Sequence, residues 1–408
     1  MENLFLKIIN TYRIEDILRK VHLLLTVFIV LWLNAGVFQY VGNKISMTIK
    51  CVLVIVWLCI SILNRDFIKN VVKNIWPLFL FFIILLLSKM LYNNETISTL
   101  IYQSFYLIII SCIFLYYSTN EMFHERKVIL CCLILDYAYV SFNTIRILIE
   151  SPEASRYLST TPEIIGLVFG DKNISAIGTY SYAYALVPLM IYIFWRGWEN
   201  KKNVYFLILL YGIVVLIMMK FTISIILLLF FIGLIIFIEY LKKHKHTISI
   251  KNLLFRLVFL AIIVLLLFKI ILIFKLLPDV ILVRIQEIFD LFSFNLSTTS
   301  DLYTRIDLYN KSVISFINSP LYGSFGAVVS YSGHSTYLDM LAYFGVISGL
   351  LFLYFKKMYL LLYKKRFIIK ILFVYLLVLG LVNNSYLSTI FLCLFIFIPF
   401  LEIEEDFK

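Results

Sequence analysis

The sequence predicts an all-α, polytopic integral membrane protein, and two observations carry that prediction. Of the 408 residues, 62% are hydrophobic and only 15% are charged, which gives a mean hydropathy of +0.97. A soluble domain of this length has a far more polar composition. Apolar runs also recur along the whole chain, and many approach the roughly 20 residues that a helix needs to cross a bilayer. We therefore expect one integral membrane domain over residues 1–408.

Twelve apolar runs are the predicted transmembrane helices. They cover about 21–41, 46–63, 75–92, 97–117, 128–149, 174–195, 204–219, 221–240, 253–277, 336–355, 367–383 and 387–402. Only Lys220 and Phe221 separate the seventh run from the eighth, so a re-entrant hairpin is the alternative there. Residues 1–20 are charged throughout and are predicted to form an amphipathic segment on the cytoplasmic face of the membrane.

The basic residues predict the orientation. With the N-terminus in the cytoplasm, most of the 36 Lys and Arg residues fall in segments at the inner face, as the positive-inside rule requires. Both termini are then cytoplasmic, and the net charge of +12 does not indicate nucleic acid binding. The third and fifth outer loops, 150–173 and 278–335, are long, which is typical of functional loops. Within the fifth, 279–292 and 300–318 have the periodicity of amphipathic helices.

The histidines single out one candidate for catalysis. Four of the five lie at the predicted inner face, whereas His334 lies in the fifth outer loop. It precedes the tenth run, where Thr336 and Asp339 have the spacing of a capping box. The positive end of that helix would keep the imidazole neutral, and a neutral ring can act as a general base. The alternative is that His334 is only a residue beside a helix cap.

Arg305 is the second candidate. It lies within the predicted 300–318 helix, and a guanidinium can hold a phosphate through two parallel hydrogen bonds. The alternative is a helix pair with Asp301, four residues earlier. Arg284 and Arg156 also lie in the long outer loops, where each by itself is typical of a solvated or interfacial charge.

A few further residues were considered on their own. Asp136 lies inside the fifth run, where an ionisable group costs at least about 2.5 kcal/mol unless it is paired or hydrated, so a functional role is the default hypothesis. Gly345 and Gly349 form a G-x-x-x-G that predicts a packing face.

The chain has no nucleotide-binding loop and no zinc motif, so we predict no cofactor. The outer-loop carboxylates leave a weak divalent-cation site open.

A longer pattern carries a resemblance. It runs from Arg305 through Asn318-Ser319-Pro320-Leu321-Tyr322-Gly323 and Gly333-His334-Ser335-Thr336-Tyr337-Leu338 to Gly345. This region resembles the signature of the O-antigen ligase/polymerase superfamily, most closely the Wzy-type polymerases of O-antigen and capsular polysaccharide. The match covers roughly residues 300–350, and topology alone covers the rest. Tyr309 stands where many relatives carry tryptophan, and the second glycine of the turn is displaced to Gly326.

The resemblance implies a glycosyltransferase of the bacterial plasma (inner) membrane with an outward-facing site. It would join oligosaccharide repeat units, carried on polyprenyl pyrophosphate, into O-antigen or capsular polysaccharide. His334 would be the base, and Arg305 would neutralise the departing pyrophosphate. The candidate substrate-binding residues are Arg284, Arg156, Tyr309, Tyr303, Tyr337 and Asp339. Besides the lipid-linked substrates and the bilayer, a flippase and a chain-length regulator are candidate partners, and nucleic acid is not.

Two other functions are compatible with the same features. An O-antigen ligase would use the same donor chemistry but transfer the glycan to another acceptor, such as a lipid core. A polysaccharide flippase or transporter needs no base. It would be expected to line its pathway with several intramembrane charges, whereas Asp136 is nearly alone in the apolar runs.

Overall fold

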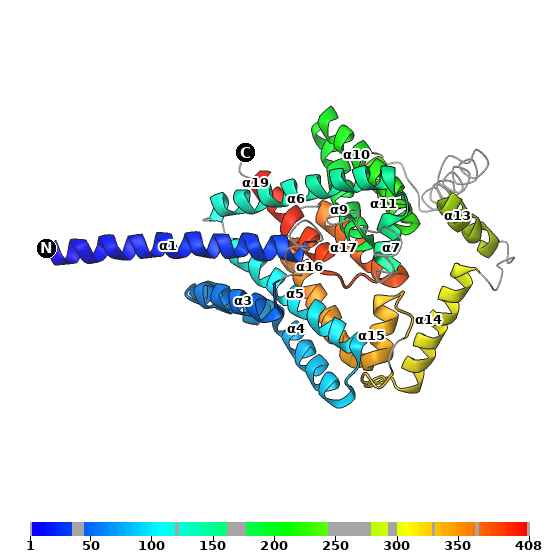
Figure 1. Ribbon diagram of the computed structural model, residues 1–408, viewed down its shortest axis with the longest axis horizontal. Coiled ribbons are helices and arrows are strands. Elements are labelled where there is room, and N and C mark those ends of the chain that lie inside the picture. The colour runs from blue at the N-terminus through cyan, green and yellow to red at the C-terminus, as the bar shows by residue number, and fades with distance from the viewer. Residues whose placement is uncertain are drawn as a thin grey trace.

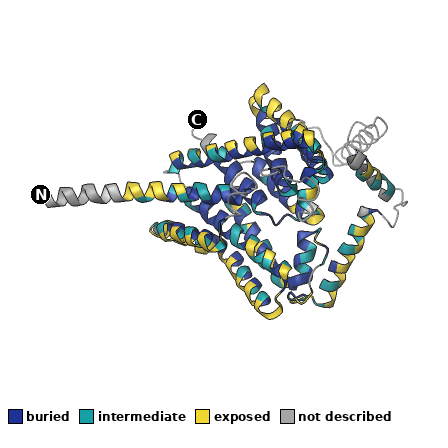
Figure 2. Ribbon diagram, in the orientation of Figure 1, coloured by how far each residue is buried: buried dark blue, intermediate teal, exposed yellow. Residues whose placement is uncertain are grey.

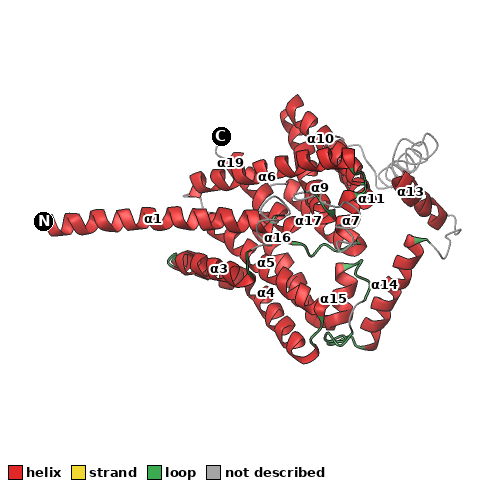
Figure 3. Ribbon diagram, in the orientation of Figure 1, coloured by secondary structure: helices red, strands yellow, loops and turns green. Residues whose placement is uncertain are grey.

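The computed structural model describes residues 2–34, 45–118, 122–160, 177–243, 279–292, 300–328, 331–363 and 367–405. All regular secondary structure in these residues is helical (Figure 3). The elements are α1 Glu2–Leu33, α3 Met47–Ile62, α4 Arg65–Tyr92, α5 Glu95–Tyr117, α6 Phe123–Glu150, α7 Ala154–Thr160, α9 Tyr180–Asn200, α10 Asn203–Met219, α11 Thr222–Lys243, α13 Asp279–Phe292, α14 Asp301–Asn318, α15 Thr336–Phe344, η3 Gly345–Ser348, α16 Gly349–Tyr363, α17 Phe367–Val382, α18 Ser388–Leu392, η4 Cys393–Phe397 and α19 Ile398–Glu405. The all-α prediction is confirmed.

Several helices have the length and composition of membrane spans. Five of the described helices qualify: Asp66–Tyr92, Glu95–Tyr117, Phe123–Glu150, Thr222–Lys242 and Thr336–Leu362. Shorter apolar helices cover Met47–Ile62, Asn203–Met219, Phe367–Val382 and Ser388–Ile403. The predicted run 253–277 lies outside the described residues.

The outward surface of these helices is apolar. Figure 2 shows exposed residues along α3, α4 and α10. They include large side chains, among them Val52, Ile55, Trp76, Leu80, Ile83, Leu207 and Leu210. Contiguous apolar surface on this scale is unfavourable in water, whereas lipid acyl chains accommodate it. The protein is therefore membrane-embedded.

Polar residues at the ends of the apolar runs fix the helix boundaries. The Asn64 side chain accepts hydrogen bonds from the first amides of α4, and the Asn94 side chain does the same for α5. Asn93, in the left-handed region with φ of 39°, ends α4 and reverses the chain. Lys220, with φ of 59°, makes the corner between α10 and α11. Short corners of this kind place consecutive helices antiparallel.

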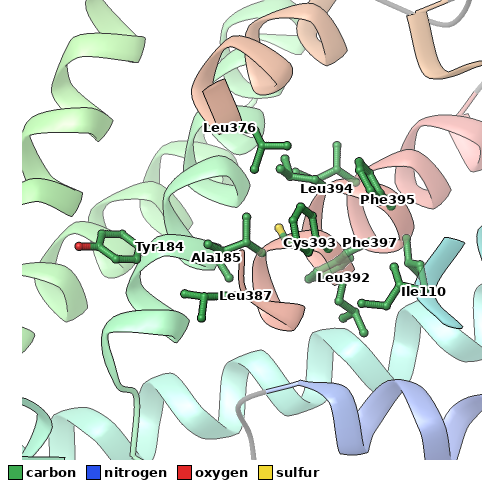
Figure 4. Packing of buried hydrophobic residues seen from close by; sticks show 14 of the residues in the cluster. Ile110, Tyr184, Ala185, Leu376, Leu387, Leu392, Cys393, Leu394, Phe395 and Phe397 are labelled. Atoms are coloured by element: carbon green, nitrogen blue, oxygen red, sulfur yellow. The ribbon is translucent and has the colours of Figure 1, made fainter. Parts of the chain in front are cut away.

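The core lies where helices from distant parts of the chain meet. In Figure 4, Ile110 of α5, Ala185 of α9, Leu376 of α17 and Leu392 of α18 pack together. All four side chains are buried. Helix α18 continues through η4, a single stretch of π-helix, into α19. These helices form the support on which the candidate site is built.

At the N-terminal end of the chain, α1 is one continuous helix of 32 residues (Figure 1). The boundary predicted at residue 20, between an amphipathic segment and the first span, falls inside this helix. Beside that boundary, Arg19 forms an ion pair with Glu125 of α6. The structure thus joins the two predicted elements into one.

The tenth predicted run is a broken helix, in which η3 separates α15 from α16. Gly345 at the break has φ of +54°, and a Cβ there would lie 2.3 Å from the Pro320 carbonyl oxygen. Gly323 is similar, because its Cβ would lie 2.5 Å from the Ala342 carbonyl oxygen. The turn after α14 therefore rests directly on the backbone of α15. Nothing lies within 4 Å of a Cβ at Gly349, so Gly345 packs against a turn and the predicted G-x-x-x-G does not act as one packing face.

Candidate functional site

The orientation of α14 determines the candidate site. Its polar face turns towards α15, and Ser312 on that face is 0% exposed. The predicted apolar stripe exists but points outward, with Ile317 66% exposed and Val313 also exposed. This arrangement is the reverse of a soluble amphipathic helix, and it suits a helix that has a polar site beneath it and the membrane interface beside it.

Tyr309 on that polar face joins the two predicted catalytic residues. Its hydroxyl donates to the backbone carbonyls of His334, at 3.3 Å, and Val382, at 3.1 Å, which share the one proton. The Arg305 guanidinium lies close enough to the same hydroxyl to act on its ionisation. Burial raises the pKa of Tyr309 above its usual value although Arg305 opposes the shift, so the hydroxyl remains a proton donor. Arg305 and the loop that carries His334 thus meet at one side chain.

Arg305, Tyr309 and the His334 loop form a cluster, and two residues that were not predicted extend it. The positive charge of Arg305 also acts on the hydroxyl of Tyr184, in α9. That hydroxyl accepts a hydrogen bond from the side chain of Asn383, which follows α17. The signal for Asn383 in the sequence is the polar Asn-Asn-Ser interruption between the last two apolar runs. The cluster therefore draws on α9, α14, the His334 loop and the end of α17.

The partners of Arg305 are chemically informative. Among the side chains that the structure describes, its charge acts on the phenol groups of Tyr309 and Tyr184, and no ion pair with a carboxylate is present. The side chain of Asp301, the predicted helix partner, lies outside the described side chains. Neutral phenols orient a guanidinium without cancelling its charge, so Arg305 retains the capacity to bind an anion.

Asp339 holds the His334 loop in place. Its Oδ1 accepts hydrogen bonds from the Ser312 hydroxyl (2.8 Å), the Ser332 hydroxyl (2.7 Å) and the Ser332 amide (3.1 Å). The Ser332 hydroxyl in turn accepts from the amides of His334 (3.1 Å) and Ser335 (3.3 Å). Asp339 was predicted to bind substrate, but these contacts make it a positioning residue for the loop.

The cap of α15 differs from the prediction by one residue. Ser335, with an extended backbone, is the N-cap, and its hydroxyl accepts from the Leu338 amide at 3.4 Å. Thr336 is already helical, and its hydroxyl is engaged by Asn383, Asn384 and Ser385. The predicted Thr336–Asp339 capping box is therefore wrong, because long-range partners compete for both side chains.

The tyrosines predicted to shape a groove occupy three different environments. Tyr309 is in the cluster. Tyr337 is only 5% exposed, its hydroxyl donates to the Leu376 carbonyl at 3.3 Å, and its ring lies against Gly380. In this structure it packs between α15 and α17, and its role towards a substrate stays a prediction. Tyr303 is exposed on α14.

The structure does not join the other two arginines to the cluster. Arg284 of α13 binds both carboxylate oxygens of Glu287, at 3.0 and 2.9 Å. This pair lies within one helix and offsets the charge. Arg156 lies in α7, which attaches to the start of α9 through the hydrogen bond from the Tyr180 amide to Ser159. Asp136, for which the sequence names no partner, accepts a 2.6 Å hydrogen bond from the buried Asn34 amide.

Comparisons with known proteins return nothing: no family model, curated protein or solved structure matches this chain. Among the residues that the structure describes, His, Cys, Asp and Glu side chains do not gather in threes or more into a metal-binding group. The features with functional content are therefore the cluster of Arg305, Tyr309 and His334 and the supports around it.

Proposed function

We propose that this chain is an outward-facing glycosyltransferase of the bacterial plasma membrane. It polymerises oligosaccharide repeat units that are carried on polyprenyl pyrophosphate. The observation that carries the proposal is the hydroxyl of Tyr309, which donates a hydrogen bond to the backbone carbonyl of His334 and lies within the electrostatic influence of Arg305. A cation without a carboxylate partner in the described side chains, near a loop that carries an imidazole, fits transfer from a pyrophosphate donor.

The proposal includes twelve spans with both termini in the cytoplasm. Contacts between connections support this sidedness. At the proposed outer face, Asn94 donates to two carbonyls of the fifth outer loop, and Lys220 pairs with Glu153 of the third. At the proposed inner face, Arg196 pairs with Glu402. In each case, segments assigned to the same side of the membrane contact one another.

The proposed reaction joins two lipid-linked glycans. A hydroxyl of the acceptor glycan attacks the anomeric carbon of the donor and passes its proton to the imidazole of His334. The new carbon–oxygen bond forms as the bond from the anomeric carbon to the pyrophosphate oxygen breaks. Polyprenyl pyrophosphate leaves with the electron pair of that bond, and the Arg305 guanidinium neutralises the charge that develops on it.

The test is polymer formation in membranes that carry His334→Ala or Arg305→Ala at normal protein levels. We expect each variant to lose roughly 100- to 1000-fold in rate, which is typical when one transition-state partner is removed. His124→Ala is the matched control, because His124 is exposed and remote from the cluster in sequence. Full chain lengths in both site variants would contradict the proposed mechanism.

Gene deletion separates the polymerase from its alternatives. Loss of a polymerase leaves single repeat units on the cell surface, whereas loss of a ligase leaves long chains on the carrier lipid. A transporter, reconstituted in vesicles with lipid-linked repeat units, would move them across the bilayer without lengthening them. Elongation by the purified chain, abolished by His334→Ala, would identify the polymerase.

A further inference from the structure

An open pocket of about 460 Å³ lies beside the second half of α14 and the turn that follows it. It is lined by Lys311, Ile314, Ser315, Asn318, Ser319, Gly323, Ser324, Val328 and Tyr331. The lining comes from the second half of α14, the turn after it and the start of the His334 loop. This volume lies within the range of small-molecule sites, roughly 300–1,000 Å³.

One polar atom in the lining has no partner. The hydroxyl oxygen of Ser324 is buried and makes no hydrogen bond within the described part of the chain. Buried polar groups are nearly always hydrogen-bonded, so an orphan in the wall of a pocket is a place where a water or a ligand atom is expected. The side chain of Asn318, also in the lining, has no hydrogen-bond partner among the described residues. It could therefore offer both an amide donor and a carbonyl acceptor.

The remaining lining residues define the class of ligand. The hydroxyls of Ser315 and Tyr331 bond each other at 2.6 Å, so this pair can both donate and accept. The ammonium of Lys311 is paired with Asp307 at 2.9 Å, which leaves the pocket with little net charge. An anionic ligand would need an unpaired cation in the lining. A neutral ligand with several hydroxyls fits better.

Apolar side chains lie among these polar groups. Ile314 and Val328 line the pocket together with the ring of Tyr331. A sugar ring has C–H faces that pack on such groups and hydroxyl edges that bond to side-chain oxygens and amides. Tyr331 precedes His334 in the same loop, and Ser312 on the neighbouring face of α14 bonds Asp339. The pocket thus adjoins the proposed catalytic cluster.

We propose that this pocket is a sugar-binding subsite that holds one hexopyranose unit of the glycan chain. That the sugar belongs to a lipid-linked glycan rests on the proposed function. The binding of the sugar does not, because it follows from the orphan hydroxyl of Ser324, the unpartnered amide of Asn318 and the near-neutral lining.

The experiment measures binding without catalysis. The full chain is purified in lipid nanodiscs, and saturation-transfer NMR is recorded with free glucose, galactose, mannose, rhamnose and N-acetylglucosamine, each with and without inorganic pyrophosphate. We expect saturation transfer to at least one sugar. Asn318→Ala and Ser324→Ala should each weaken that binding about 3- to 10-fold, the equivalent of one hydrogen bond.

The chain offers a matched control. Asn310→Ala removes the same side chain from the same helix, but Asn310 does not line the pocket, so binding should be unchanged. Ser324→Ala should fold normally, because the hydroxyl that it removes makes no bond within the described structure. The proposal is overturned if none of the sugars binds, if both pocket variants bind like the wild type, or if pyrophosphate displaces the sugar.

The outcomes also separate this proposal from the proposed function. If His334→Ala abolishes polymer while no sugar binds the pocket, the subsite is wrong and the polymerase stands. If sugar binding is lost in the pocket variants while His334→Ala and Arg305→Ala make full-length polymer, the subsite stands and the catalytic proposal is wrong.

Discussion

Two arginines at opposite ends of the proposed membrane domain have opposite surroundings. Arg196, near the end of α9, is 3% exposed and lies between the carboxylates of Glu199 (3.0 Å) and Glu402 (3.1 Å). Arg305, in α14, is half-buried and faces the phenol groups of Tyr309 and Tyr184. The first charge is neutralised inside the protein and holds α9 to α19. Among the described side chains no carboxylate pairs with the second, which fits the proposal that its charge acts on a substrate.

The histidines show the same contrast. His22 is 1% exposed, and its two ring nitrogens bond the hydroxyls of Tyr117 and Ser61, each at 2.8 Å. Its ring also stacks on Trp57. His334 is half-exposed on a loop that Ser332 and Asp339 hold in place through the backbone. Both ring nitrogens of His22 are bonded within the core, whereas at His334 the described contacts position the backbone of the loop.

The largest expected effect tests the neutralised arginine. Glu402→Ala leaves Arg196 buried with only Glu199 beside it, and breaking a buried pair costs about 3–5 kcal/mol. We expect little folded protein and a strongly lowered midpoint of thermal unfolding. Arg305→Ala is the counterpart, and its midpoint should stay close to that of the wild type while its activity is lost. If Glu402→Ala is as stable as the wild type, the proposed structural role of Arg196 is wrong, and with it the contrast to Arg305.

The next effect concerns the turn that supports the outer cluster. Gly345→Ala places a Cβ 2.3 Å from the Pro320 carbonyl oxygen at a positive φ, so we expect a loss of at least about 2 kcal/mol in the free energy of unfolding. Gly349→Ala is the control, because nothing lies within 4 Å of its Cβ. It should be neutral or stabilising by up to about 1 kcal/mol. Chemical denaturation of both variants in the same detergent gives the comparison.

A smaller effect tests whether Tyr309 links the cluster. Tyr309→Phe keeps the ring but removes the hydroxyl that bonds the His334 carbonyl and lies near Arg305, so we expect the polymerisation rate to fall about tenfold, the equivalent of one hydrogen bond. The loss should appear in kcat more than in KM, because positioning is affected rather than binding. Tyr303→Phe, on the exposed side of α14, should behave like the wild type. If the two variants have equal rates, Tyr309 does not hold the site together.

The smallest effect sharpens the comparison of the arginines. Arg284 already binds Glu287 in a partly exposed pair within α13, and such pairs contribute at most about 1 kcal/mol. We therefore expect Arg284→Ala to change neither stability nor polymer length appreciably. Shortened polymer in this variant would show that Arg284 binds substrate, as the sequence resemblance implies, and that its pair with Glu287 opens when substrate arrives.

Local features of the sequence predicted the elements well. The amphipathic helices expected at 279–292 and 300–318 correspond to α13 Asp279–Phe292 and α14 Asp301–Asn318. Their periodicity is a property of neighbouring residues, so no distant contact is needed to recognise it. The candidates Arg305 and His334 came from residue type and position, and the structure brings them together through Tyr309.

Partners that are distant in the chain could not be predicted. Asp136 bonds Asn34, which is 102 positions away, and Asn383 completes the cluster from beyond α17. The burial of Tyr337 was not predicted for the same reason, since it depends on α17. Periodicity predicted that α14 has an apolar face and a polar face. It did not predict which face packs against the protein, because in a membrane both faces have a suitable environment.

The sequence by itself therefore determined the class of the protein, the two amphipathic helices α13 and α14, and which residue types were candidates for chemistry. These follow from hydrophobicity and periodicity, which act over a few residues. Only the tertiary structure decided which charges are neutralised and which remain available. That depends on which side chains from distant segments come within hydrogen-bonding distance, and it is why Arg196 is a structural residue and Arg305 is a candidate for catalysis.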